Sequence, residues 1–318
     1  MTSNRVIDKQ FMQTTFKDQA NAWIRSAYGE DGISFPVAKH RARLVLQILA
    51  EENKPLAVAD LGCGGGHLAA LLAEAGHTIT GIDQSEKMIE IACARQQKLG
   101  TLARKRVTFV NAELEHQYLK KASMDCVVSM GVIGYLPDDD LLFSQAKQLL
   151  KPGGLFLVSC RNRLFNMSSL THRTLREIEN GTAGVLLGEI DSLYRTIDED
   201  AVSDFVNTLV TITTALAGSP PSTALDLQQN TDNSITNTDS AVEARQHTPT
   251  ELNATAARYG MTEQAVYGVH PHIMDPRLAG LLPKGFFDKL CEAMTAFEGE
   301  SAVLPVCSVF LSVYRRQD

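Results

Sequence analysis

The stretch VADLGCGGGHLA, residues 58–69, places four glycines within five positions directly after a short apolar run. Glycine is unfavourable inside both strands and helices, so a cluster of this kind indicates a turn in which main chain must approach something closely. In an open α/β sheet, a glycine turn between the first strand and its helix lies at the edge where ligands bind. The main-chain N–H groups of such a turn favour a polar or anionic group. We therefore expect a ligand site at residues 62–66.

Strands and helices are expected to alternate around this turn. The expected strands before residue 160 are 56–61, 78–83, 106–111, 125–130 and 155–160. The helices expected between them are 66–75, 85–99 and 138–150. After an interruption we expect a helix over 249–259 with Thr248 as its N-cap, a strand over 263–269, a helix over 283–297 and a last strand over 305–315. This alternation predicts an α/β fold, a Rossmann-like doubly wound sheet of seven strands, mostly parallel with an antiparallel last strand.

The same pattern predicts four segments along the chain. Residues 1–55, with helices expected over 6–28 and 36–50, are expected to form a helical lid at the N-terminus. Residues 56–160 form the predicted ligand-binding core, and residues 161–246 form a helical and loop insertion that caps the substrate. Residues 247–318 are expected to complete the sheet and to supply segments of the acceptor site.

Composition narrows the possible partners and the compartment. The 318 residues carry a formal charge of −7, which argues against broad nucleic-acid binding but leaves room for a local basic groove. The sequence has no apolar run long enough to cross a membrane and no signal-like N-terminus. Its six cysteines lack C-x-x-C spacing, so we expect structural thiols, no metal site and a cytoplasmic location. The oligomeric state cannot be predicted from these features.

Asp83 ends the second expected strand, 21 positions beyond Gly62. A carboxylate at this spacing is suited to accept hydrogen bonds from the two hydroxyls of an adenosine ribose. The glycine spacing is G-x-G-x-G, and His67 stands where a dinucleotide-binding fingerprint needs its third glycine. A nicotinamide oxidoreductase is therefore the least favoured function, and a tight turn without a ligand is the structural alternative.

Five motifs in a fixed order carry a family resemblance: DLGCGGGHLA, GIDQSEKMIEIA, VNAELEH, DCVVSMGVIGYLPD and LLKPGGLFLVS. Over about residues 56–160, the chain resembles the class I S-adenosylmethionine-dependent methyltransferases. The resemblance implies S-adenosylmethionine as cofactor, with Asp83 on the ribose. It implies further cofactor-binding residues, namely Asp60, Gly62, Gly64, Gly66, Gln84, Met88, Asn111, Ala112, Glu113, Ser129 and Met130. Asn111 departs from the family, which often has Asp here, and a simple turn residue is the alternative reading.

Residues that could serve the acceptor follow the later strands. His247, His270 and His272 are expected near the ligand edge, where a histidine can act as general base at neutral pH. A structural, hydrogen-bonded histidine is an equal alternative for each of them. Tyr135, Arg161 and Asn162 are candidate substrate-binding residues, although packing explains Tyr135 and an internal ion pair explains Arg161 equally well.

The function predicted from the sequence is methyl transfer from S-adenosylmethionine to an oxygen or nitrogen of a small-molecule acceptor. A tRNA methyltransferase acting on the carboxyl group of a modified wobble uridine is one alternative, because RNRLFNM (161–167) and the C-terminal segment resemble such enzymes faintly. A cofactor-binding protein without turnover is another. The atom that receives the methyl group cannot be identified from the sequence.

Overall fold

A computed structural model describes residues 37–116, 118–196, 244–272 and 290–318, with a few positions between 200 and 211. The helix expected over 6–28, the polar stretch 218–242 and the first half of the helix expected over 283–297 lie outside these residues. So does the side chain of His270.

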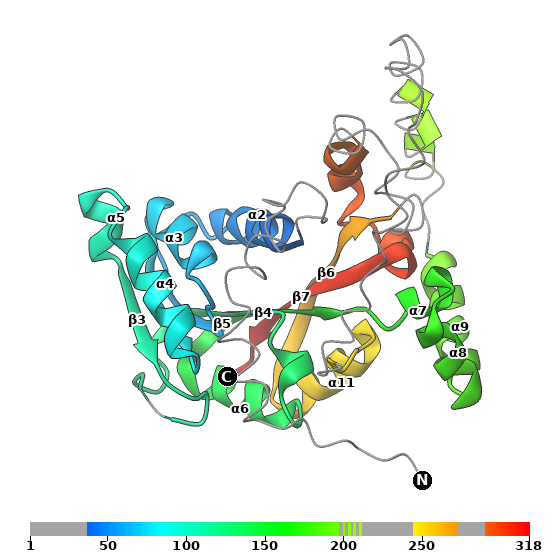
Figure 1. Ribbon diagram of the computed structural model, residues 1–318. Coiled ribbons are helices and arrows are strands. Elements are labelled where there is room, and N and C mark those ends of the chain that lie inside the picture. The colour runs from blue at the N-terminus through cyan, green and yellow to red at the C-terminus, as the bar shows by residue number, and fades with distance from the viewer. Residues whose placement is uncertain are drawn as a thin grey trace, which may run out of the picture. The chain divides into compact units, whose positions relative to one another are not determined.

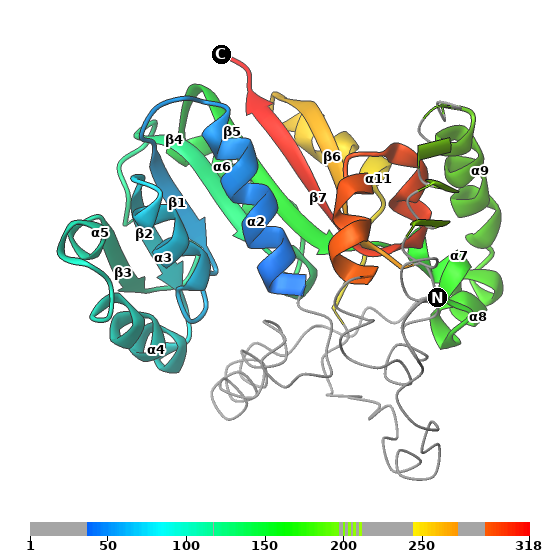
Figure 2. The same cartoon turned by 90° about the horizontal axis from the view of Figure 1, so that it is seen from above.

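One seven-stranded sheet organises the chain (Figures 1 and 2). Its strands are β1 (Ala57–Leu61), β2 (Thr78–Asp83), β3 (Val107–Asn111), β4 (Met124–Met130), β5 (Leu150–Arg161), β6 (Met261–Pro271) and β7 (Cys307–Arg316). Their order is β3-β2-β1-β4-β5-β7-β6, the pairs from β3 to β5 are parallel, and the last strand is antiparallel. The predicted fold class is confirmed. Because β1 lies between β2 and β4, the strand order reverses there and opens a crevice at the carboxyl ends of the strands.

Helices pack on both faces of the first five strands. They are α2 (Val37–Ala50), α3 (His67–Glu74), α4 (Glu86–Gln96), α5 (Thr101–Lys105) and α6 (Asp140–Leu149), followed later in the chain by α11 (Pro249–Arg258). The views place α2 over one face and α6 with α11 over the other (Figures 1 and 2). The expected start of α11 is confirmed: Thr248 Oγ1 accepts from the Glu251 N–H at 3.2 Å, and Glu251 returns the bond in a capping box.

The apolar runs of the central strands form the core. Val58 and Ala59 in β1 and Val127 in β4 are fully buried, as expected for parallel strands covered on both faces. On the side of α6, the ring of Phe143 meets Phe156 of β5 edge to face at 5.2 Å. Burying an aromatic ring of this size contributes about 2 kcal/mol. The core therefore holds the carboxyl ends of β1, β2 and β4 in a fixed arrangement.

The chain divides into two compact units. The first comprises residues 1–161, 244–266 and 311–318, and the second comprises residues 162–243 and 267–310. The second contains three helices in the segment expected to be a helical and loop insertion, although no bounds were predicted for them: α7 (Phe165–Ser169), α8 (His172–Glu179) and α9 (Ala183–Tyr194). Buried Glu177 of α8 joins them, since it accepts from Arg163 at 2.7 and 2.9 Å, from Asn166 of α7 at 2.9 Å and from the hydroxyl of Thr182, the N-cap of α9, at 2.5 Å. A buried carboxylate of this kind is stable only when it is paired and hydrogen-bonded.

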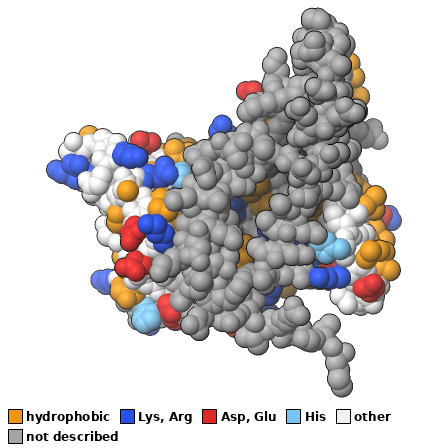
Figure 3. Space-filling view, viewed as in Figure 1, with side chains coloured by type: hydrophobic (Ala, Val, Ile, Leu, Met, Phe, Trp, Pro, Cys, Tyr) orange, Lys and Arg blue, Asp and Glu red, His pale blue; other side chains and the backbone are white. Residues whose placement is uncertain are grey.

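Charge is unevenly distributed over the surface. From Ile91 to Ala112 the sequence has five basic residues and no acidic one, and Lys98, Arg104 and Lys105 among them are exposed. Figure 3 shows Lys and Arg side chains gathered over the region of α5. The region around α5 is therefore basic, although the chain as a whole carries a negative charge.

In the described part of the chain, no helix is both long and apolar enough to span a bilayer.

Candidate functional site

The glycine turn between β1 and α3 has a main-chain conformation that requires glycine. Gly62, Gly64 and Gly66 have φ angles of 77°, 50° and 71°, in the left-handed region. A Cβ atom on Gly62 would also collide with the side chain of Val132, and one on Gly66 would collide with Phe109. The Gly62 and Cys63 N–H groups both donate to the carbonyl of Ile82, at 2.8 and 3.0 Å. The turn is therefore held against the end of β2.

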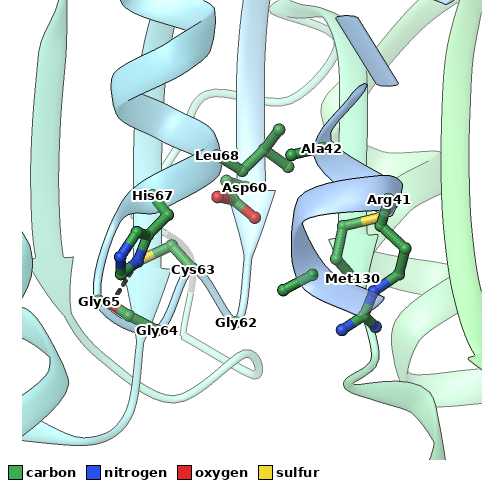
Figure 4. A pocket seen from close by; sticks show the side chains of 11 residues that line it. Arg41, Ala42, Asp60, Gly62, Cys63, Gly64, Gly65, His67, Leu68 and Met130 are labelled. Atoms are coloured by element: carbon green, nitrogen blue, oxygen red, sulfur yellow. Dashed lines mark hydrogen bonds between the residues drawn. The ribbon is translucent and has the colours of Figure 1, made fainter. Parts of the chain in front are cut away.

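A pocket opens beside this turn (Figure 4). Its lining comes from α2, the end of β1, the glycine turn, the start of α3 and the end of β4: Ala38, Arg41, Ala42, Asp60, Gly62, Cys63, Gly64, Gly65, His67, Leu68 and Met130. Four of these were expected at the site by role: Asp60, Gly62, Gly64 and Met130. The pocket therefore lies at the crevice that the strand order predicts.

Asp83 closes the glycine turn from the neighbouring strand. Its Oδ2 accepts from the Gly64 N–H and its Oδ1 from the Ser85 N–H, both at 2.9 Å. Burial raises the pKa of Asp83, and these two hydrogen bonds offset part of that rise. The carboxylate is thus fixed between the turn and the start of α4, with lone pairs left over for a ligand.

Asp60, at the end of β1, is the second carboxylate of the pocket. Its side chain is 2 % exposed, and its Oδ2 has no hydrogen-bond partner among the described residues. Burial, and then the negative charge of Asp83, raise the pKa of Asp60 to about 7. Buried polar atoms are nearly always paired, so this oxygen is suited to receive a donor from a ligand.

Arg41 is a pocket residue that the sequence analysis missed. This side chain of α2 is 8 % exposed, and its Nη1 donates to Ser159 Oγ at 3.1 Å. Its guanidinium also fills the space that a side chain on Gly131 would occupy. A signal was present, because Arg41 lies on the apolar stripe of α2, one turn from Ala38 and from Val45. A guanidinium at the edge of a pocket is a group that can bind an anion.

His67 and Cys63 complete the wall of the pocket. Arg95 of α4 contacts the Nε2 atom of His67 and donates from Nε to the Gly65 carbonyl at 3.0 Å. Burial, followed by the charge of Arg95, lowers the pKa of His67 to about 4, so the ring is neutral at pH 7. Burial together with Asp60 and Asp83 raises the pKa of the Cys63 thiol. Neither residue therefore adds charge to the pocket near neutral pH.

The residues expected around an adenine follow β2 and β3. Met88 and Ala112 are buried, whereas Gln84 and Glu113 are half-buried. Asn111 is exposed, and its amide donates to the main-chain carbonyl of Asp83 at 3.0 Å. The structure thus brings these side chains to the ends of the neighbouring strands β2 and β3 and, for Met88, to the first turn of α4, which follows β2.

The residues expected near the end of β4 differ in their surroundings. Ser129 is fully buried and its hydroxyl donates to the Leu61 carbonyl at 3.0 Å, so its side chain ties β4 to β1. Tyr135 is half-buried in the short helix η1 (Ile133–Tyr135) that follows β4.

His247 forms a buried cluster with two charged residues. Its Nε2 lies 2.9 and 3.1 Å from the two oxygens of Asp139, and Arg245 Nη2 lies 2.7 Å from Asp139 Oδ1. Burial raises the pKa of Asp139, but the bonds and charges of His247 and Arg245 outweigh it and lower the pKa overall. His247 Nδ1 is buried and has no partner within the described ranges. Nδ1 is therefore the ring atom through which His247 would act as the predicted general base.

The other expected acceptor residues differ in their surroundings. His272 belongs to the second unit, where its Nε2 lies 3.0 Å from Ser308 Oγ and its ring contacts Phe165. Arg161 is exposed at the end of β5, and its carbonyl accepts from the His247 N–H at 3.1 Å. The role predicted for His270 falls on a side chain outside the described residues.

Asn162 is fully buried in the second unit, and its side chain is hydrogen-bonded to main-chain groups. The amide donates to the carbonyls of Leu304 and Cys307 at 2.6 and 2.9 Å, and the oxygen accepts from the Leu164 N–H at 3.0 Å. These contacts favour a structural role, so substrate binding by Asn162 stays a prediction without support from its surroundings.

No group of three or more His, Cys, Asp or Glu side chains suited to a metal ion occurs within the described ranges.

Comparisons with known proteins agree with this geometry. Residues 59–158 match a family described as "Methyltransferase domain". A ubiquinone biosynthesis O-methyltransferase of Hydrogenovibrio crunogenus is 33 % identical over 148 residues, covering 46 % of this chain and 59 % of the relative. A ubiquinone biosynthesis O-methyltransferase of Coxiella burnetii is 30 % identical over 165 residues, covering 51 % and 66 %. The chain thus spans about three fifths to two thirds of the length of these curated relatives.

A solved structure extends the likeness of fold to the whole chain. The magnesium protoporphyrin IX methyltransferase of Synechocystis PCC 6803, crystallised with bound SAH, has a TM-score of 0.56 at 14 % identity, over 98 % of this chain and 100 % of that one. At this identity the likeness concerns the fold alone. Together with the motifs around the glycine turn and Asp83, the comparisons identify residues 59–158 as a methyltransferase domain of the class I S-adenosylmethionine-dependent family.

Proposed function

We propose that this protein transfers a methyl group from S-adenosylmethionine to an oxygen or nitrogen atom of a small-molecule acceptor. The observation that carries the proposal is the pocket between the glycine turn and α2, where the buried oxygen of Asp60 has no partner among the described residues and Asp83 is held in place by main-chain N–H groups. A nucleoside that carries an amino acid and a positive charge matches these groups.

Asp83 would hold the ribose. Within the described ranges, each carboxylate oxygen accepts one main-chain N–H, from Gly64 or from Ser85, so each retains a lone pair for a sugar hydroxyl. Because both bonds come from main chain, the carboxylate is oriented before the ligand binds, and little entropy is lost on binding.

Arg41 and Asp60 would hold the charged amino-acid portion. The planar guanidinium of Arg41 is suited to bind a carboxylate through two hydrogen bonds. Asp60 would accept a hydrogen bond from an ammonium group, or face the positive sulfur, with its unpartnered oxygen. The opposite signs of these two residues fix the direction in which the amino acid lies in the pocket.

Residues at the ends of β2 and β3 would enclose the adenine. Met88 supplies a buried apolar surface, and Gln84 and Glu113 supply polar groups. The amide of Asn111 already donates to the Asp83 carbonyl, which leaves the side-chain oxygen of Asn111 as an acceptor for the exocyclic amine. Asn can therefore replace the Asp that is common in the family.

The bound cofactor supplies a methyl carbon on a positively charged sulfur, and the protein must align the acceptor and remove its proton. We assign proton removal to His247. Since Asp139 accepts from Nε2, the neutral ring carries its hydrogen there and presents the lone pair of Nδ1 as base. Asp139 would then stabilise the imidazolium that forms, and Arg245 would hold Asp139 in place.

The names of the relatives support a hydroxyl group as the first acceptor to test, because both are described as ubiquinone biosynthesis O-methyltransferases. All six cysteines are free thiols, which supports a reducing compartment such as the cytoplasm.

The test uses the purified full chain and methyl-labelled S-adenosylmethionine with a panel of phenols, catechols, carboxylic acids and amines, and with total tRNA in a separate arm. We expect label in at least one small acceptor, and none with an Asp83→Ala variant. Cofactor binding without transfer to any acceptor, or label in tRNA alone, would contradict the proposal.

A further inference from the structure

Asp60 is a buried acid of the pocket that forms no ion pair with any cation among the described residues. Its side chain is 2 % exposed and its Oδ2 is unpartnered within the described part of the chain. In Figure 4 its carboxylate lies between the glycine turn and α2, and the guanidinium of Arg41 points away from it. Arg41 instead donates to Ser159 on β5.

The groups around Asp60 do not neutralise a negative charge. Asp83, from β2, carries the same sign and disfavours ionisation of Asp60. Cys63, from the turn, has a raised thiol pKa, and His67, from α3, has a pKa of about 4, so both are neutral near pH 7. An ionised Asp60 in this environment is therefore costly until a cation arrives.

We propose that Asp60 determines specificity for the charge of the cofactor: it keeps a proton in the empty pocket and releases it to solvent when a cationic sulfonium nucleoside binds. This inference rests on the proposed function, because it assumes that S-adenosylmethionine enters this pocket. It adds that the pocket distinguishes the methyl-donating sulfonium from the neutral thioether that remains after transfer.

The direction of the pH effect follows from the raised pKa of about 7. At pH 6 most empty molecules carry the proton on Asp60, and a bound cation lowers the pKa by favouring the carboxylate. Binding then releases a proton from Asp60 at pH 6 and progressively less of one as the pH rises above this pKa. The contribution of Asp60 to sulfonium affinity should accordingly rise by roughly tenfold between pH 6 and pH 8, apart from the titration near pH 8 of the ligand's own α-amino group, which both ligands share.

The thioether product should couple more weakly. It shares the amino-acid and nucleoside portions with the sulfonium but lacks the positive charge on sulfur. Both ligands carry the ammonium group, so the charge on sulfur is what separates them, and the affinity of the thioether should rise by a factor at least about twofold smaller over the same range. Product would then be released more readily at neutral and higher pH than at pH 6, relative to the sulfonium.

Isothermal titration calorimetry of the full chain tests this inference. S-adenosylmethionine and S-adenosylhomocysteine are each titrated at pH 6 and pH 8, in two buffers that differ in ionisation enthalpy, so that the proton count is measured directly. At pH 6 the α-amino groups of both ligands are protonated and add little to that count. The Asp60→Asn variant has no proton to release, and Glu90→Gln, an exposed change on α4, is the matched control.

We expect proton release at pH 6 in the wild type and in Glu90→Gln, more for the sulfonium than for the thioether, and none in Asp60→Asn. Binding without proton release, equal release with both ligands, or unchanged release in Asp60→Asn would overturn the inference and leave the proposed function intact. No binding of either ligand to the wild type would overturn both. If Asp60→Asn does not bind, the carboxyl NMR signal of isotope-labelled Asp60 decides: a titration midpoint near 7 in the empty wild type supports the inference, and an ordinary midpoint near 4 overturns it.

Discussion

The Gly64 N–H and the Oδ2 atom of Asp83 lie 2.9 Å apart, so the glycine turn of one strand and the carboxylate that ends the next are a single structural unit. The Ser85 N–H holds the other oxygen of Asp83 at the same distance. A carboxylate fixed on both oxygens by main chain is ready to bind a ligand that contacts the turn. The position of Asp83 thus depends on the fold of the turn, and the shape of the turn depends on Asp83.

Replacing Asp83 by Ala should abolish cofactor binding. The change removes both acceptors for the ribose and leaves the Gly64 and Ser85 N–H groups without their partner, which costs about 1–3 kcal/mol for each buried group. We expect affinity for S-adenosylmethionine to fall by about a hundredfold or more, measured by calorimetry. Circular dichroism should show a retained fold, and an affinity within twofold of the wild type would contradict the ribose assignment.

Replacing Gly62 by Ala should also remove binding, for a steric reason. Its φ of 77° disfavours any side chain, and the added methyl would collide with Val132 at the edge of the pocket. The matched control is Gly76→Ala, because Gly76 has a φ of 102° but no neighbour close enough to collide. Both variants should lose some thermal stability, and only Gly62→Ala should lose cofactor binding. Equal binding by both variants would argue against a ligand at the turn.

Arg41 should contribute to cofactor affinity through its guanidinium. Arg41→Lys keeps the charge but loses the paired donors, so we expect roughly tenfold weaker binding, and Arg41→Ala should weaken binding further. Arg43→Lys is the control, since Arg43 lies on the same helix and donates to Gln47 instead. Calorimetry with S-adenosylmethionine separates these cases, and unchanged affinity in both Arg41 variants would exclude this residue from the cofactor site.

Asp139 should stabilise the fold in a pH-dependent way. Its pKa is lowered in the folded protein, so its contribution is present above the ordinary carboxyl pKa of about 4 and is lost as pH falls through the lower folded value. Asp139→Asn should therefore cost about 2 kcal/mol at pH 7 and progressively less below pH 4. Urea unfolding of the wild type and of Asp139→Asn, at pH 7 and below pH 4, measures this loss of unfolding free energy. A loss that grows on acidification would contradict the stabilising role of the Asp139 carboxylate.

The sheet and the cofactor end of the site were predictable because they follow local rules. Apolar runs alternating with amphipathic stretches place β1 to β4 within one residue of their expected bounds, whereas β5 begins at Leu150, five residues before its expected start. The glycine turn and Asp83 follow from their spacing. The bounds of α7 to α9 escaped prediction because side-chain bonds between segments, such as those of Arg163 and Asn166 to Glu177, help to hold them, although Thr171 is a local N-cap signal for α8. Asp139 was missed as the partner of His247 because the two residues are 108 positions apart.

The most direct test of the central claim is a crystal structure of the full chain with S-adenosylhomocysteine. We predict that both ribose hydroxyls lie within hydrogen-bond distance of Asp83 and that the amino-acid portion lies between Asp60 and Arg41, against the glycine turn. A ligand bound elsewhere, or a pocket in which a protein side chain occupies the place of the nucleoside, would contradict the account.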